Sequence, residues 1–178
     1  MLDHVDRFDA AFFNISPKEA ELIDPNERLF LEVAAHAIED AGYTPDTLAQ
    51  AHGPRENAVG VYVGVMWGDY QLHGVDRAQD TWATPHSFYW SIANRVSYQF
   101  NFSGPSLALD TACSSSLTAI HLACQAIRQG EIDAAIAGAS NLSLHPNKYN
   151  LLSHLHFLSQ DGRCRAFGEG GDGYVPGE

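Results

Sequence analysis

Residues 106–140 constrain the fold more than any other part of the chain. Residues 106–111, SLALDT, form a short apolar segment typical of a buried strand, and residues 133–140, DAAIAGAS, form a second one. Between them, four apolar residues recur at helical spacing: Leu117, Ile120, Cys124 and Ile127. A strand, helix, strand unit of this length joins parallel strands by a right-handed crossover, with the helix packed on the sheet. The chain is therefore expected to have a layered α/β architecture.

Residues 57–65, NAVGVYVGV, form a further apolar segment that is rich in β-branched residues and nearly free of charge. Strands that are buried on both faces have this composition, and they occur in parallel sheets. Residues 91–100 fit either a helix or a strand, because Pro85 and Gly104 bound the segment without deciding its type. We favour a helix there.

A well-marked helix is predicted from Pro25 to Ala41. Asp24 is a good N-cap, Pro25 suits the first helical position, and Glu27 completes a capping-box pattern. Gly42 is the kind of residue that ends a helix. Four apolar residues predict a face that needs another layer to cover it: Leu29, Val33, Ala37 and Ala41.

The chain carries 22 acidic and 10 basic residues, which gives a net charge of -12 at pH 7. This charge repels a phosphate backbone, and no cluster of Lys and Arg reverses it locally, so nucleic acid is excluded as a partner. No run of about 18 apolar residues is present to span a bilayer, and the first ten residues lack the order of a secretory signal. These features predict a cytoplasmic protein without a membrane partner, folded as one domain over residues 1–178.

Cys113 lies where the segment 106–111 passes into the predicted helix. Free backbone N–H groups at a helix start would point towards its thiol, and such a position lowers a thiol pKa from about 8.5 to between about 3.5 and 7.5. The thiolate is the nucleophilic form, and the same N–H groups could bind the oxyanion formed when it attacks a thioester. The small neighbours of Cys113 leave room for an acyl chain. This position fits a catalytic nucleophile.

Position alone leaves a second interpretation of Cys113 open, because free cysteines are among the most buried residues and the thiol could simply pack in the core. Three cysteines without a CxxC pair argue against both a disulfide framework and a thiolate zinc site. Cys124 lies on the predicted apolar helix face and is expected in the core. Cys164 stands between Arg163 and Arg165 and is interpreted as a loop thiol rather than a second nucleophile.

Two other patterns suggest ligands, and we interpret both as structural. Residues 168–173, GEGGDG, fit the GxGxxG string of dinucleotide loops, but no apolar strand precedes them, no helix is predicted after them, and their carboxylates would repel a pyrophosphate. His145, His154 and His156 form a weak pattern for metal ligands, because a two-residue spacing in an apolar stretch brings no third ligand type nearby. We therefore expect neither a metal nor a directly bound cofactor.

The string DTACSSSL, residues 110–117, decides between the two interpretations of Cys113. It resembles the active-site signature of β-ketoacyl synthase (ketosynthase) domains in modular type I polyketide synthases. Residues 7–43 resemble the early helical region of that family, residues 94–117 its nucleophile strand and turn, and residues 161–178 its Gly-rich loop. The resemblance therefore extends over almost the whole chain.

Residues 60–71 and 141–149 are further similar to ketosynthases of polyketide lines whose acyltransferase acts in trans. The resemblance implies a thiolase-like layered α/β/α fold, of which this chain is an incomplete N-terminal portion with mainly parallel strands, without the family's first strand and C-terminal half. It implies a decarboxylative Claisen condensation of acyl groups that acyl carrier proteins hold on 4'-phosphopantetheine. Cys113 would accept the acyl chain, and the loop around Met66 would lie near the acyl pocket. The implied partners are an acyl carrier protein, the rest of the module and a second copy in a homodimer.

Condensation in the family needs two histidines, which belong to HGTGT-like and GHxxxAAG-like motifs. Neither motif occurs in this sequence, and none of its nine histidines matches one. The isolated chain is therefore expected to be incompetent for condensation, while Cys113 can still be acylated. Two alternatives stay open: a non-elongating ketosynthase that only passes the acyl chain onward, and an inactive or complementing fragment that acts as a structural partner.

Overall fold

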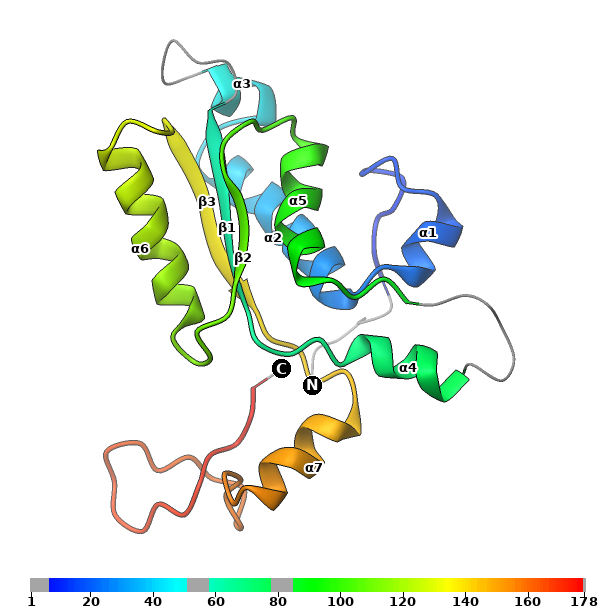
Figure 1. The fold of residues 1–178 in the computed structure, drawn as a ribbon, viewed down its shortest axis with the longest axis vertical. Helices are drawn as coiled ribbons and strands as arrows, with labels where there is room; N and C mark the ends of the chain where they lie inside the picture. The colour runs from blue at the N-terminus through cyan, green and yellow to red at the C-terminus, as the bar shows by residue number, and fades with distance from the viewer. Residues whose placement is uncertain (1–6, 51–57, 78–84, 178) are drawn as a thin grey trace.

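A parallel three-stranded sheet forms the centre of the computed structural model, which describes residues 7–50, 58–77 and 85–177 (Figure 1). Its strands are β1 (Val59–Val65), β2 (Ser106–Leu109) and β3 (Ala134–Ser140), in the order β2-β1-β3. The paired residues run in parallel register along both β2 and β3. The sheet confirms the α/β architecture and the parallel strands predicted from the sequence.

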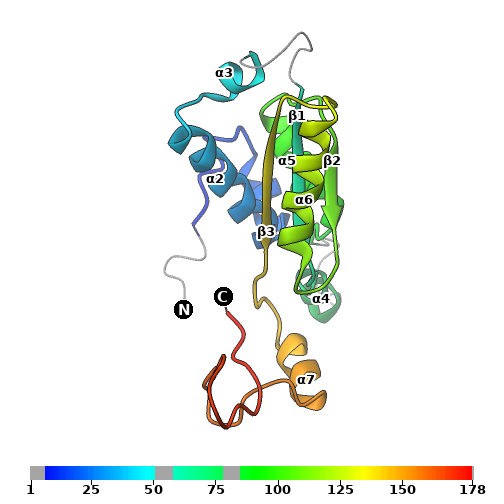
Figure 2. The ribbon, with the colours of Figure 1, turned by 90° about the vertical axis from the view of Figure 1, so that its left-hand side faces the viewer.

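Helices cover both faces of this sheet, which gives three layers (Figure 2). One face is covered by α6 (Ser115–Arg128), and the other by α2 (Pro25–Asp40) and α5 (Tyr89–Gln99). The helix favoured for residues 91–100 is therefore confirmed. The connection from β2 through α6 to β3 passes over β1, so the two strands of the predicted unit are parallel but not neighbours.

The seven residues of β1 are all buried, as predicted, and they alternate between the two layers. Val59, Val61, Val63 and Val65 belong to the core against α2 and α5. Tyr62 belongs to a second, smaller core against α6. The large side chains of β1 thus fill one layer, while two glycines and one tyrosine leave room for α6 on the other.

The face of α6 that covers the sheet is not the predicted one. Four small residues of α6 are buried: Ser115, Ala119, Ala123 and Ala126. The predicted face is exposed instead, with Leu117 at 70%, Ile120 at 46% and Ile127 at 43% exposure. Cys124 is also exposed, so its placement in the core was wrong. The glycines of β1 allow α6 to pack close to the sheet. Only the face of α6 that carries the alanines is small enough to pack at that distance.

The ends of α2 are largely as predicted, but its buried face is different. Asp24 is the N-cap, and its Oδ1 accepts a hydrogen bond from the backbone N–H of Asn26; Gly42, at φ 82°, follows the helix end. Five apolar residues are buried: Phe30, Leu31, Ala34, Ala35 and Ile38. The predicted face, Leu29, Val33, Ala37 and Ala41, is exposed. Glu27 pairs with Arg95 of α5, so its predicted role in a capping box was wrong.

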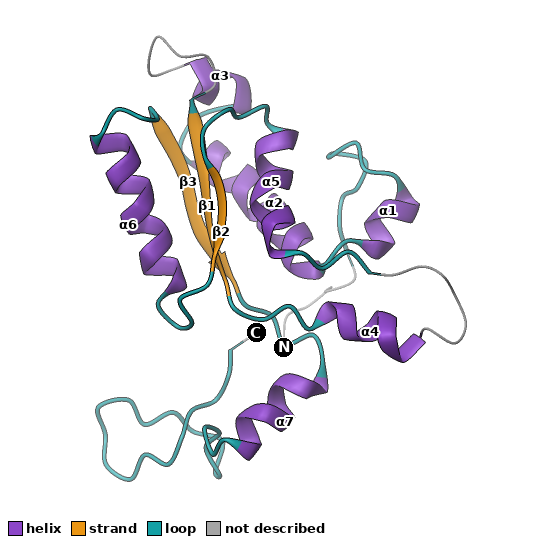
Figure 3. Ribbon diagram, in the orientation of Figure 1, coloured by secondary structure: helices purple, strands orange, loops and turns teal. Residues whose placement is uncertain are grey.

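Four further helices were not predicted: α1 (Pro17–Leu22), α3 (Pro45–Gln50), α4 (Tyr70–Arg77) and α7 (Pro146–His154). The last two lie beyond the carboxyl ends of the strands (Figure 1). The chain after α7 runs as a long loop, in which Leu158 and Tyr174 form an isolated bridge (Figure 3). Among the helices that the structure describes, none combines the length and apolar character that a membrane crossing requires.

Candidate active site

Cys113 occupies the turn between the end of β2 at Leu109 and the start of α6 at Ser115. This is the strand-to-helix junction predicted from the sequence. The side chain is exposed, so the interpretation of Cys113 as a packed core residue is wrong for this chain. An exposed thiol at a helix start has the access that an attacking nucleophile needs.

A network of short hydrogen bonds holds the turn in shape. Ala112 has a φ of 54°, a left-handed conformation that is uncommon for a residue with a side chain. Asp110 Oδ1 accepts from the backbone N–H of Ala112 at 2.8 Å, and Ser115 Oγ donates to the Ala112 carbonyl at 2.6 Å. The Thr111 N–H donates to Ser115 Oγ at 2.9 Å. Residues on both sides of Cys113 thus fix the direction in which the chain presents it.

The N-cap residue of α6, Ser114, makes no side-chain capping bond. Its hydroxyl donates instead to the carbonyl of Thr111 at 2.8 Å, back across the turn. A serine N-cap normally accepts from the N–H groups of the first turn. The N–H groups of Ser114 and Ser115 donate to the carbonyls of Thr111 and Ala112, at 3.4 and 3.1 Å. The expected oxyanion site would therefore use other N–H groups at the start of α6. That role for the amides stays a prediction.

Gly64 of β1 allows the start of α6 to lie directly on the sheet. A β-carbon on Gly64 would come within 2.7 Å of the Ser115 carbonyl carbon and 2.9 Å of the Ser116 nitrogen. Contacts this short do not occur in proteins without movement of the backbone. The absence of a side chain at Gly64 therefore sets the position of the turn that carries Cys113.

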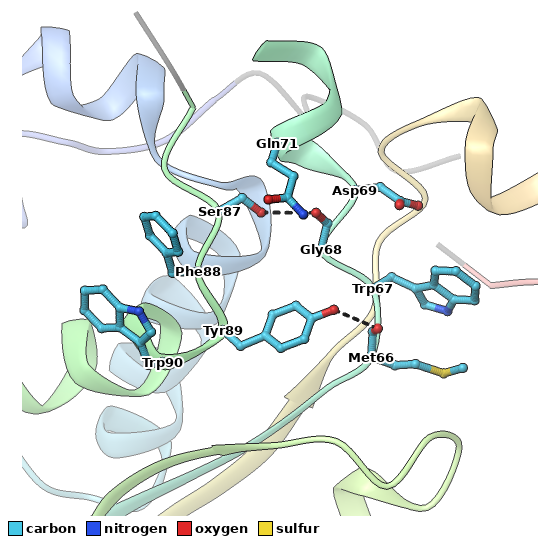
Figure 4. A pocket seen from close by; sticks show the side chains of 9 residues that line it. All are labelled: Met66, Trp67, Gly68, Asp69, Gln71, Ser87, Phe88, Tyr89 and Trp90. Atoms are coloured by element: carbon cyan, nitrogen blue, oxygen red, sulfur yellow. Dashed lines mark hydrogen bonds between the residues drawn. The ribbon is translucent and has the colours of Figure 1, made fainter. Parts of the chain in front are cut away.

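An open cavity of about 520 Å³ lies beyond the end of β1 (Figure 4). It is formed by the loop after β1, the start of α4 and the start of α5, with the lining residues Met66, Trp67, Gly68, Asp69, Gln71, Ser87, Phe88, Tyr89 and Trp90. Aromatic rings dominate the lining, as is typical of sites for apolar ligands. Met66, predicted to lie near an acyl pocket, is one of the lining residues; Cys113 is not among the described residues that line the cavity.

Tyr89 lines this cavity and bonds the loop after β1. Its hydroxyl donates to the Met66 carbonyl at 2.8 Å, which ties the start of α5 to the loop after β1 (Figure 4). Burial raises the pKa of Tyr89, and the negative charges of Asp110, Asp69 and Asp24 raise it further. Asp110 is also the acceptor for Ala112 in the turn. The charge of a residue in the turn therefore acts on the phenol of a residue that lines the cavity.

Tyr174 is a residue that the sequence did not indicate, and its pKa responds to the charge of Cys113. Burial raises the pKa of Tyr174, and the negative charge of the Cys113 thiolate raises it further. Its backbone is held between Phe157, whose carbonyl accepts at 2.9 Å, and Ser159, whose N–H donates at 3.0 Å. The only signal in the sequence was the Gly-rich segment around Tyr174, which permits the loop to turn back.

Cys164 lies in this loop, as predicted, and is exposed. Its sulfur accepts a hydrogen bond from the N–H of Val175 at 3.1 Å. The guanidinium of Arg165 pairs with Asp161 and lies 3.8 Å from Asp172, so two carboxylates balance its charge. Residues 168–173, the GxGxxG string, form part of the same loop with no helix after them in the described chain.

The three histidines singled out in the sequence serve different parts of the chain. His145 caps α7, because its Nδ1 accepts from the N–H of Asn147 at 3.1 Å. His154 ends α7, and His156 follows it with a φ of 56°. In the ranges covered by the structure, no group of three or more His, Cys, Asp or Glu could hold a metal ion.

A sequence model described as the N-terminal domain of β-ketoacyl synthase matches residues 1–178. The chain belongs to the β-ketoacyl synthase family. Polyketide synthase PksL of Bacillus subtilis is 56% identical over 98% of this chain, and polyketide synthase ThaG of Burkholderia thailandensis is 52% identical over 99%. The matches span 4% and 3% of those two proteins, so the ketosynthase chain corresponds to a small part of each.

Solved ketosynthase structures have the same fold. An oxazolomycin ketosynthase domain from Streptomyces albus matches 98% of this chain with a TM-score of 0.91 and 56% identity. The ketosynthase from module 6 of the bacillaene synthase of Bacillus subtilis matches 100% with a TM-score of 0.86 and 42% identity. The aligned region is 30% and 29% of those chains. The expected thiolase-like α/β fold, present here as its N-terminal part, is confirmed.

Proposed function

We propose that Cys113 is the acyl-accepting nucleophile of a ketosynthase in polyketide biosynthesis. The observation that carries the proposal is the exposed thiol of Cys113 at the strand-to-helix turn, inside the string that resembles the ketosynthase signature. Membership of the β-ketoacyl synthase family supports the same reaction class. The substrate would be an acyl thioester carried on the 4'-phosphopantetheine arm of an acyl carrier protein.

The acylation step follows from the position of the sulfur. The Cys113 thiolate attacks the thioester carbonyl, and the carbonyl oxygen becomes an oxyanion that backbone N–H groups at the start of α6 can stabilise. Collapse of this intermediate breaks the bond to the phosphopantetheine sulfur, which leaves as a thiolate and takes up a proton. The acyl group is then held on Cys113 as a new thioester, and no oxidant or metal is needed.

The cavity around Met66 supplies a place for the acyl chain. Its lining is rich in aromatic side chains, and Tyr89 joins it to the electrostatic environment of Asp110 beside the nucleophile. The proposal includes the entry of an extended acyl group on Cys113 into this cavity. We propose Met66 as a substrate-binding residue on this basis.

The full reaction would extend the acyl chain by two carbons, through decarboxylative Claisen condensation with a malonyl-type extender. The partners we propose are an acyl carrier protein, a second ketosynthase copy and the rest of the module, in a line whose acyltransferase acts in trans. Residues 60–71 and 141–149 support that subtype, and the bacillaene and oxazolomycin ketosynthases are structural neighbours. A cytoplasmic location stays a prediction.

Mass spectrometry of the chain after incubation with a hexanoyl thioester of N-acetylcysteamine tests the acylation step. We expect one hexanoyl adduct on Cys113 and none in Cys113→Ala. Cys124→Ala and Cys164→Ala are matched controls, because their thiols are also exposed. If Cys113→Ala labels as well as the parent, the assignment of the nucleophile fails.

The elongation step needs a separate test in the full-length polypeptide that carries residues 1–178. Adding a malonyl-loaded acyl carrier protein to the acylated protein should give a chain two carbons longer. Transfer of the unextended acyl group to the carrier protein would instead identify a non-elongating ketosynthase.

A further inference from the structure

Lys148 of α7 is a buried lysine, with 1% of its surface exposed. Its ammonium donates to Asn141 Oδ1 at 2.9 Å, to Ser143 Oγ at 3.2 Å and to the Leu142 carbonyl at 3.5 Å. All three acceptors belong to the connection between β3 and α7. A buried charge is costly unless several partners compensate it, so this arrangement fixes the connection in one conformation.

The same ammonium reaches the loop that forms one wall of the cavity. It lies 5.7 Å from the centre of the Trp67 ring, within the range of a cation–π interaction. Burial lowers the pKa of Lys148, and the negative charge of Asp69 raises it in part. The Oδ2 atom of Asp69 is buried without a hydrogen-bond partner in the described chain, so the charge of Lys148 favours the ionised carboxylate. Figure 4 shows the Trp67 ring and the Asp69 carboxylate on the same side of the loop.

The opposite side of this loop is fixed by a separate set of bonds. Ser87 donates to the buried carboxylate of Asp24 and lies 3.5 Å from the Gly68 carbonyl. Tyr89 donates to the Met66 carbonyl at 2.8 Å. The loop 66–69 is thus held by Ser87 and by Tyr89 of α5 on one side and by Lys148 on the other. Removing Lys148 would free one side while the other stays attached.

We propose that Lys148 is a positioning residue that sets the selectivity of the cavity for acyl chains by fixing the loop 66–69 through Trp67 and Asp69. This inference rests on the proposed function, in which the cavity receives the acyl group bound to Cys113. Lys148 is buried and does not touch the substrate. Its effect is therefore on the fit of longer acyl chains rather than on the reactivity of the sulfur.

The test compares acetyl and hexanoyl thioesters of N-acetylcysteamine as substrates for acylation in the full-length polypeptide. We expect Lys148→Met to lower the preference for hexanoyl over acetyl about fivefold, mainly through KM, because one cation–π contact of ordinary strength is lost. The rate at which iodoacetamide alkylates Cys113 should stay unchanged, since that reagent needs no pocket. Lys148→Arg keeps the charge and should restore most of the preference.

Lys18→Met is the matched control, because Lys18 is the other lysine of the chain and is exposed. Its preference for hexanoyl over acetyl and its rate of alkylation by iodoacetamide should equal those of the parent. Equal losses with acetyl, hexanoyl and iodoacetamide in Lys148→Met would show a purely structural role and overturn the inference. An unchanged preference for hexanoyl over acetyl in Lys148→Met would also overturn the inference. A parent that no thioester acylates would instead overturn the proposed function.

Trp67→Leu covers the case in which Lys148→Met fails to fold. It removes the ring near the ammonium but keeps the three hydrogen bonds of Lys148. We expect the same loss of hexanoyl preference, with little further loss when both substitutions are combined. A Trp67→Leu variant with the parental preference would contradict the inference.

Discussion

Gly64 of β1 and Ser115 of α6 lie so close that a β-carbon on Gly64 would be 2.8 Å from Cβ of Ser115. The first residue of the helix that follows Cys113 therefore rests on a position where the strand has no side chain. Ser115 Oγ also accepts from the Thr111 N–H and donates to the Ala112 carbonyl, next to Cys113. A change at Gly64 is thus transmitted to the turn through the start of α6.

We expect Gly64→Ala to lower the free energy of unfolding by about 1 to 3 kcal/mol, because an added methyl group forces the helix away from the sheet. Acylation of Cys113 should slow as well, since the turn moves with the helix. Urea unfolding and thioester labelling measure the two effects. Gly171→Ala is the control, because a β-carbon there meets only Arg165 at 3.9 Å. If Gly64→Ala has the same free energy of unfolding as the parent, the close contact between Gly64 and the start of α6 is contradicted.

Ala112 allows a second test of the turn. Its left-handed backbone, at φ 54°, excludes a β-branched side chain more strongly than a methyl group. We expect Ala112→Val to destabilise the chain by about 1 to 2 kcal/mol and to slow acylation, whereas Ala112→Gly keeps both near the parental level. Thermal unfolding and mass spectrometry of the acylated protein provide the measurements. If Ala112→Val and Ala112→Gly have equal stability and equal rates of acylation, the turn is not strained at Ala112.

Arg95 of α5 joins two carboxylates, with Glu27 at 2.8 Å and Glu19 at 3.0 Å. Glu27 is buried, and its second oxygen has no hydrogen-bond partner in the part of the chain that the structure describes. We expect Arg95→Met to lower the free energy of unfolding by about 3 kcal/mol, because a buried charge loses its partner. Urea unfolding measures this change. Arg128→Met, at an exposed position, should differ from the parent by less than about 0.5 kcal/mol.

The exposed apolar face of α6 predicts self-association of the isolated chain, residues 1–178. Leu117 and Ile120 are large and exposed on this face, and exposed apolar patches favour association. Replacing both residues with glutamine should shift the chain towards monomer in sedimentation velocity. Replacement of the exposed polar residue Gln125 with alanine is the control and should change nothing. A parent that is monomeric at high concentration would contradict this prediction.

Local patterns predicted the elements that matter most for the site. Apolar composition identified β1, and the position of Cys113 between an apolar strand and a helical repeat identified the turn. Asp24 and Gly42 marked the ends of α2 because capping depends on only a few neighbouring residues. The resemblance of residues 110–117 then assigned a chemical role to the sulfur, which position alone had left open.

The faces of α2 and α6 were predicted wrongly for one physical reason. Each helix carries two stripes with helical spacing, and periodicity does not tell which stripe meets the sheet. On α6 the larger residues, such as Leu117, suggested the buried face, yet the alanine stripe is buried. The choice depends on Gly64 and Tyr62 of β1, which come from another part of the chain.

The sequence by itself determined the parallel α/β class, the capped ends of α2 and the place of Cys113 at the start of a helix, because these depend on residues close together in the chain. Only the tertiary structure decided which helix faces are buried, that the backbone of Tyr174 bonds those of Phe157 and Ser159, and that Lys148 reaches the loop of Trp67. Those relationships join residues distant in sequence. They depend on how closely the backbones approach, which no local pattern contains.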